Sequence, residues 1–170
     1  QELFMKGFIC GVTGKDGLMT VQEANKKAQA LILSVKSEEA LKKYGDNKAA
    51  GEKFLAENAK KKDVNILKDG IQYKVIQEGK GAIPTATQKV KVHYEGRTLD
   101  GKVFDSSYKR EKPAEFRCNQ LIKGWMEALT CMPVGSIWEV YIPQELAYGD
   151  HQQGNDIKPF SMLIFKIELL

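Results

Sequence analysis

The hydrophobic pattern of this 170-residue chain changes its period near Gly70. Before this point, apolar residues recur every three or four positions, which is typical of amphipathic helices. After it, apolar and polar residues alternate, which is typical of strands with one buried face. The pattern therefore predicts a mixed α/β protein, and the length leaves room for one or two small domains.

One long helix is expected in the first half. Thr20 and Glu23 have the spacing of a capping box, in which each side chain accepts a hydrogen bond from the backbone N–H of the other residue. Apolar residues follow at helical spacing, and a sparser stripe continues to about Lys62. Gly45 lowers helix propensity within this segment, so the helix either breaks there or runs through it. A helix this long and this polar is expected to connect two bodies.

Several strands and one short helix are expected in the second half. Asp100 and Gly101 lie between apolar runs and form a strong hairpin-turn signal. The segment 144–160 is a long polar loop, and such loops in a compact domain are usually functional or mobile. The alternation predicts strands at 71–76, 90–95, 137–142 and 162–169, another strand that begins at 103, and a short helix at 122–129.

Composition and charge exclude some functions. The net charge of +4 falls on residues 1–80, which contain no arginine, so solvated helix faces explain it better than a nucleic-acid surface. Three widely spaced cysteines do not form a disulfide framework, although their number does not settle the compartment. His93 and His151 lack partners at metal-ligand spacing, and no phosphate-binding or nucleophile motif is present. We therefore expect neither a metal nor a cofactor.

Three motifs lie in order in the second half: VHYEGRTLDGKVFDSS at 92–107, LIKGW at 121–125 and AYG at 147–149. With them, the chain from Lys74 to Leu170 resembles the FKBP-type peptidyl-prolyl isomerases. The resemblance implies an α+β fold in which an antiparallel half-barrel sheet wraps around a short helix, with a pocket between the two. It also implies an enzyme that isomerises X–Pro bonds of unfolded or folding polypeptides.

The resemblance assigns the site residues one by one. In the family, the tyrosine of VHY, the ring and carboxylate of FDSS, and the phenol of AYG form the catalytic site. A basic residue pairs with the carboxylate, the tryptophan forms the pocket floor, an isoleucine N–H anchors substrate, and apolar side chains form the walls. The implied catalytic residues here are Tyr94, Phe104, Asp105 and Tyr148, and the implied substrate-binding residues are Arg110, Leu121, Ile122, Trp125, Ile157 and Phe165.

Some of these residues also have simpler explanations. Without the resemblance, Asp105 and Arg110 would be interpreted as an ordinary surface ion pair, worth about 0–1 kcal/mol. We assign Phe116 and Trp138 to core or surface packing, and His93 to the core or to a hydrogen-bond network. Ala114 stands where many family members have an aromatic residue, so one pocket wall is expected to be thinner. Binding of large FK506- or rapamycin-type macrolides should then be weakened.

The first half is similar to the bacterial Mip, FkpA and FklB subgroup, on the segments NKAAGEKFLAENAKKKDV and LKDGIQYKVIQEGKG. This implies a partial helical dimerisation domain and linker helix at 1–65, followed by the isomerase domain at 66–170. A homodimer through the N-terminal helices is then expected. The resemblance to this subgroup favours the bacterial cell envelope as the location of the protein, with the cytoplasm as the alternative. The candidates for a partner surface, or alternatively for a core stripe within one subunit, are Leu3, Phe4, Phe8, Leu31 and Ile32.

A second function of another class also fits. The thin wall at Ala114 and the polar loop at 149–159 are compatible with a chaperone or peptide-binding module whose isomerase pocket is weak or silent. Either function would use proline-containing polypeptides as clients.

Overall fold

The computed structural model describes residues 20–170. The chain divides into two compact units, residues 1–42 and residues 43–170. Three of the candidates for a partner surface or a core stripe, Leu3, Phe4 and Phe8, lie outside the described residues. Within residues 20–170, no helix combines the length and the apolar character needed to cross a membrane.

The long helix α2 spans Val21–Asn58. The capping box at its start is confirmed, because the Thr20 N–H donates to the Glu23 carboxylate at 2.8 Å and the Glu23 N–H donates to Thr20 Oγ1 at 3.2 Å. The helix runs through Gly45 without a break. It ends at Asn58, before the expected Lys62, and the backbone continues there in a turn in which the Lys61 N–H donates to the Asn58 carbonyl at 3.1 Å. The buried Asn58 side chain donates to the Gln72 side chain.

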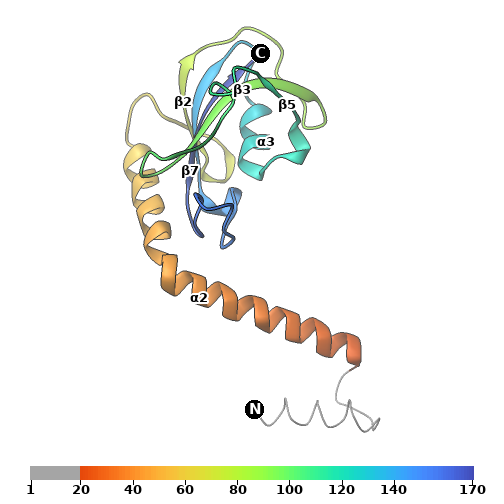
Figure 1. The fold of residues 1–170 in the computed structure, drawn as a ribbon. Helices are drawn as coiled ribbons and strands as arrows, with labels where there is room; N and C mark the ends of the chain where they lie inside the picture. Colours follow the sequence, from red (N-terminus) through yellow and green to blue (C-terminus); the bar gives the residue numbers. More distant parts are fainter. Residues whose placement is uncertain (1–19) are drawn as a thin grey trace. The chain divides into compact units, whose positions relative to one another are not determined.

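Residues 65–170 contain a single antiparallel sheet, which confirms the α+β class (Figure 1). The strand order is β1-β2-β6-β7-β3-β4. Strand β5 pairs with the first half of β3, and β4 pairs with the second half. The strands are β1 (Asn65–Ile66), β2 (Gln72–Gln77), β3 (Lys89–Thr98), β4 (Val103–Ser106), β5 (Ala114–Arg117), β6 (Ile137–Ile142) and β7 (Leu163–Leu169).

All five expected strands are confirmed to within a few residues, and two short strands, β1 and β5, were missed. The hairpin turn between β3 and β4 is also confirmed, since the Gly101 N–H donates to the Thr98 carbonyl at 2.9 Å. Gly101 has a φ of +86°, a conformation that favours glycine. Strands β1 and β5 have only two and four residues, so their alternation is too short to stand out.

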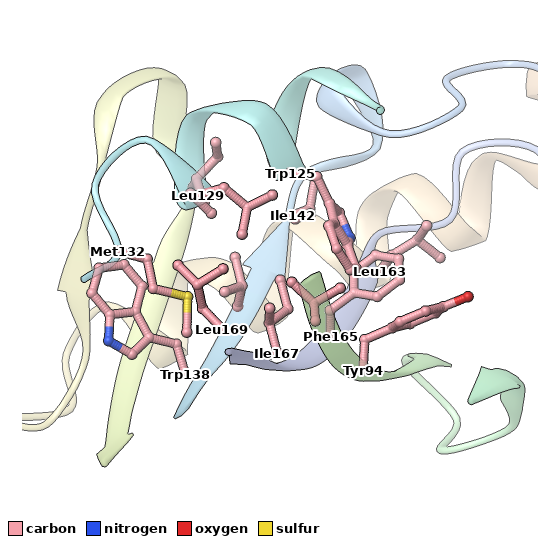
Figure 2. Packing of buried hydrophobic residues seen from close by; sticks show 14 of the residues in the cluster. Tyr94, Trp125, Leu129, Met132, Trp138, Ile142, Leu163, Phe165, Ile167 and Leu169 are labelled. Atoms are coloured by element: carbon pink, nitrogen blue, oxygen red, sulfur yellow. The ribbon is translucent and has the colours of Figure 1, made fainter. Parts of the chain in front are cut away.

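The short helix α3 (Lys123–Leu129) lies against one face of the sheet (Figure 1). Its residues Trp125, Ala128 and Leu129 are buried and pack on side chains from β3, β6 and β7. Figure 2 shows this cluster, with Trp125 and Tyr94 at one end and Trp138 at the other. The core therefore lies between α3 and the sheet, as the family resemblance implied.

The loop between β6 and β7 is anchored rather than loose. It begins with a 3₁₀ helix, η3 (Gln144–Leu146), and contains an isolated bridge between Gln153 and Ile157. Ile157 and Phe160 are buried, although most of their neighbours are polar. Ile157 was expected as an apolar wall residue, whereas the burial of Phe160 was not anticipated from the polar sequence around it.

Candidate active site

A cavity of about 350 Å³ lies at the end of the core that contains Trp125. The side chains around it come from four strands, from α3 and from the loops that precede α3 and follow β6. All but two of the predicted site residues line it. The lining residues are Tyr94, Phe104, Asp105, Phe116, Gln120, Leu121, Ile122, Trp125, Tyr148 and Phe165.

Aromatic rings pack edge to face around the cavity. Trp125 is the last residue of the LIKGW motif and lies in the first turn of α3. Its indole meets the Tyr94 ring with centroids 5.3 Å apart and planes at 86°. Phe165 of β7 meets Phe104 of β4 in the same way, at 5.7 Å and 86°. Such perpendicular contacts are favourable for aromatic quadrupoles. They hold the rings as walls, so the cavity stays open.

Gly96 allows two of these walls to approach one another. A Cβ atom at this position of β3 would lie 2.6 Å from the Phe104 ring and 2.7 Å from the Phe165 ring. Both distances are shorter than atoms can tolerate, so any larger residue must displace a ring. The glycine is therefore required by the site and not by the backbone conformation.

Three polar side chains form a closed network beside the rings. The Tyr94 hydroxyl and the Arg110 guanidinium both donate to the Asp105 carboxylate, one to each oxygen. Arg110 Nη2 also donates to the Tyr94 hydroxyl oxygen at 2.9 Å. Asp105 and Arg110 are thus joined through a pocket tyrosine, which an isolated surface ion pair would not be.

This network keeps Asp105 ionised and Tyr94 protonated at neutral pH. Partial burial raises the pKa of Asp105, but the hydrogen bonds from Tyr94 and Arg110 outweigh it and leave the pKa lowered. Burial raises the pKa of Tyr94, and its hydrogen bond to Asp105 raises it further. The carboxylate is therefore a fixed negative charge and not a base waiting for a proton.

Two donors at the cavity have no partner within residues 20–170. One is the Ile122 backbone N–H, at the residue that caps α3. The other is the Tyr148 hydroxyl, whose pKa is raised by burial, so it stays protonated. First-turn N–H groups have no carbonyl to bond within the helix. Both groups are free to bind carbonyl oxygens of a bound chain.

Comparison with known proteins identifies the family. The family model for FKBP-type peptidyl-prolyl cis-trans isomerase matches residues 80–170. The model for the domain amino terminal to FKBP-type peptidyl-prolyl isomerase matches residues 1–75. This chain belongs to the FKBP-type peptidyl-prolyl cis-trans isomerase family. The family, the fold and the bacterial subgroup predicted from the motifs are confirmed.

Bacterial relatives of this FKBP-type chain are similar over both halves. The FKBP-type 22 kDa peptidyl-prolyl cis-trans isomerase of Escherichia coli is 58% identical over 122 residues, which cover 72% of this chain and 59% of that protein. Outer membrane protein MIP of Legionella longbeachae is 42% identical, with coverage of 99% and 74%. The aligned part of this chain thus spans between 59% and 74% of the length of these two curated relatives.

Solved structures agree with this assignment. FkpA from Escherichia coli matches with a TM-score of 0.74 and 35% identity, covering 99% of this chain and 80% of that one. A peptidyl-prolyl cis-trans isomerase from Pseudomonas syringae matches with a TM-score of 0.70 and 39% identity, covering 75% and 93%. The division into domains at residue 65 is not tested by these matches and stays a prediction.

Two lining residues were missed by sequence reasoning. Phe116, which we assigned to packing, lies at the cavity with its ring edge-on to Tyr94 at 5.9 Å. The alternation of Ala114-Glu-Phe-Arg could have indicated it, because Ala114 and Phe116 then share one face of β5. Gln120 directly precedes the LIKGW motif, and that adjacency was the available signal.

Two predicted site residues do not line the cavity. Arg110 contacts it only through Asp105 and Tyr94. Ile157 is buried in the hydrophobic core, so its role as a wall residue stays a prediction. Ala114, which was expected to thin a wall, pairs with Val92 and is also absent from the lining.

The histidines have structural partners. His93 Nδ1 lies 3.0 Å from Ser107 Oγ, and its ring stacks on Tyr108, which confirms a network histidine. His151 pairs with Asp150 in an exposed loop. Among residues 20–170, no group of three histidine, cysteine or acidic side chains is arranged to hold a metal.

Proposed function

We propose that this FKBP-type chain catalyses cis–trans isomerisation of X–Pro bonds in unfolded or folding polypeptides. The observation that carries the proposal is an apolar, ring-lined cavity. At this cavity, the Ile122 N–H and the Tyr148 hydroxyl have no hydrogen-bond partner among residues 20–170. The names of the curated relatives, which are peptidyl-prolyl isomerases, support it.

The reaction needs a barrier to fall, not a bond to break. Rotation about the prolyl bond loses amide resonance, which opposes it by about 18–20 kcal/mol. The cis and trans forms differ by only about 0.5–1 kcal/mol, so both populate unfolded chains and exchange slowly. Because the twisted amide is less charge-separated than the planar one, a water-poor pocket disfavours the planar ground state more.

Each part of the site has a role in this scheme. The proline ring would pack against Trp125 at the floor of the cavity, between the walls formed by Phe104 and Phe165. The two free donors would hold the carbonyls that flank the prolyl bond and favour a turn-like substrate. No proton moves in the reaction, so the fixed charge of Asp105 orients the neighbouring dipoles and acts neither as an acid nor as a base.

A direct kinetic test separates this function from the chaperone alternative. Isomerisation of Phe-Pro and Leu-Pro peptides should be followed through a protease that cleaves only the trans form. The proposal requires a rate above the uncatalysed background that rises linearly with protein concentration. Rates at background, with suppression of client aggregation intact, would instead support a peptide-binding chaperone. FK506- and rapamycin-type macrolides should compete for the same cavity.

We further propose a homodimer through the N-terminal helices of the complete protein. Two candidate residues for the partner surface are exposed in α2, Leu31 by 63% and Ile32 by 54%. Sedimentation of the chain at micromolar concentration tests this proposal, and a monomer would contradict it. The cell envelope is the proposed location, supported by the relative named Outer membrane protein MIP, and cell fractionation would test it.

A further inference from the structure

The last part of α2 contacts the loop between β6 and β7. The Asn47 side-chain amide donates to the Pro159 carbonyl at 3.0 Å, across 112 positions of sequence. One turn further along the helix, Gly51 packs so closely on Met162 that a Cβ atom would lie 3.2 Å from its side chain. Both contacts lie within the compact unit of residues 43–170.

The hydrogen bond from Asn47 is flanked by empty space. A second cavity of about 360 Å³ lies beside it, between α2, the β3–β4 turn and the loop. Asn47, Ala50, Asp156, Lys158 and Met162 are among the residues that line it. Packed side chains do not fill this space. Besides the Gly51–Met162 contact, the loop is therefore held here by two polar contacts, the Asn47 amide on the Pro159 carbonyl and the ion pair of Asp156 with Lys102 at 2.5 Å.

The anchored carbonyl leads directly to a strained residue. Phe160 follows Pro159 and has a φ of +59°, which is rare for an aromatic residue and persists only where the surroundings hold it. Its ring is buried, and its N–H donates to the Gly149 carbonyl at 2.7 Å. Gly149 in turn donates to the Gln144 carbonyl at 2.9 Å. These bonds close the base of the loop.

Tyr148, which lines the isomerase cavity, immediately precedes Gly149. A continuous set of contacts therefore runs from Asn47 through Pro159 and Phe160 to the backbone beside Tyr148. We propose that Asn47 is a positioning residue for the isomerase site, because it holds the loop that presents the Tyr148 hydroxyl to substrate. The proposal rests on the proposed isomerase function, and it adds a residue of the long helix to the site.

Two substitutions separate this role from a general effect on stability. Asn47→Asp keeps the size of the side chain but places a carboxylate against the Pro159 carbonyl, where it cannot donate. Asn47→Ala removes the donor and introduces a better helix former, so α2 itself should not be weakened. Lys48→Ala is the matched control. Lys48 is the next residue along α2, and its side chain forms an ion pair with Glu52 of the same helix.

The test uses the full chain and two readouts. In Asn47→Asp, kcat/KM on prolyl peptides should fall about five- to ten-fold, in line with the cost of slightly misplaced site groups. Amide exchange at Gly149 and Phe160 should accelerate by about ten-fold, because the loop opens locally. Asn47→Ala should also lower kcat/KM and accelerate this amide exchange, without a lower Tm. Lys48→Ala should leave kcat/KM and amide exchange at the values of the parent.

A double-mutant cycle asks whether Asn47 acts through Tyr148. In a Tyr148→Phe background, Asn47→Asp should cost less than about two-fold in kcat/KM, since coupled residues are not additive. An undiminished penalty, or parental exchange and kinetics in Asn47→Asp, would overturn the proposal. If the parent itself shows no activity, the proposed function fails, and exchange at Phe160 still decides whether Asn47 holds the loop.

Discussion

Trp125 and Phe165 meet edge to face at the cavity, with ring centroids 5.2 Å apart and planes at 85° (Figure 2). The two residues come from α3 and β7, 40 positions apart in the sequence. Their contact forms the corner between the floor of the cavity and one wall. Through this corner, the hydrophobic core continues into the candidate site.

Phe104→Ala should lower kcat/KM by about 10- to 100-fold, since it removes one wall of the cavity, and each factor of ten corresponds to about 1.4 kcal/mol in the barrier. Trp138→Ala is the control. This residue stacks on Tyr73 at 4.1 Å, at the other end of the core, so its loss should cost about 3–5 kcal/mol of folding free energy. Folded Trp138→Ala protein should keep most of its kcat/KM in peptide assays. Equal losses in the two variants would mean that the pocket is wrongly assigned.

Gly96→Ala should damage the site more than the fold. The new methyl group would displace the Phe104 or Phe165 ring, with an expected cost of about 1–3 kcal/mol in stability and about ten-fold in kcat/KM. Gly101→Ala has open space around its Cβ but a φ of +86°, so it should lose stability alone. Urea unfolding and peptide kinetics on both variants make the comparison. Parental kcat/KM in Gly96→Ala would contradict the tight approach of the two rings.

The contribution of Asp105 to stability should depend on pH only in acid. The pKa of Asp105 is lowered in the folded protein, so the ionised carboxylate stabilises the fold at every pH above the unfolded value of about 3.9. That stabilisation is lost as the pH falls from this value through the folded pKa. In Asp105→Asn it should be absent throughout.

Urea unfolding of the parent and of Asp105→Asn measures this dependence. The difference in unfolding free energy should stay constant from about pH 8 to about pH 5 and shrink below about pH 4. The ratio of their kcat/KM values should also stay constant over the neutral range. A ratio that titrates near neutral pH would indicate that Asp105 exchanges a proton during the reaction.

The last turns of α2 should be required for a stable isomerase domain. Phe54 and Leu55 are half-buried and cover a buried cluster of Tyr141, Met162 and Ile164. Full burial of one large apolar side chain is worth about 1.5–3 kcal/mol, so the two together contribute a part of that each. A chain that begins at residue 66 should therefore unfold at lower urea concentration than a chain that begins at residue 43. Equal midpoints would support the predicted domain boundary at residue 65.

Local features were predictable because they depend on neighbouring residues. The capping box of Thr20 and Glu23, the Asp100-Gly101 turn and strand β6 all appear where their short patterns indicate. The sequence did not decide whether the helix breaks at Gly45, and the structure shows that α2 continues through it. Helix propensity alone is a weak guide, because tertiary contacts often override it. Family motifs then named the pocket residues, although periodicity could not have chosen them from the other aromatics.

The amino-acid sequence by itself determined the order of helix and strands, the turn chemistry and the family. These follow from periodicity, capping and motifs, which are read along the chain. Only the tertiary structure decided that Phe116 faces the cavity, that Ile157 is in the core and that Asn47 holds Pro159. Contacts between distant segments depend on how sheet, helix and loop pack in space, and a one-dimensional pattern does not specify that packing.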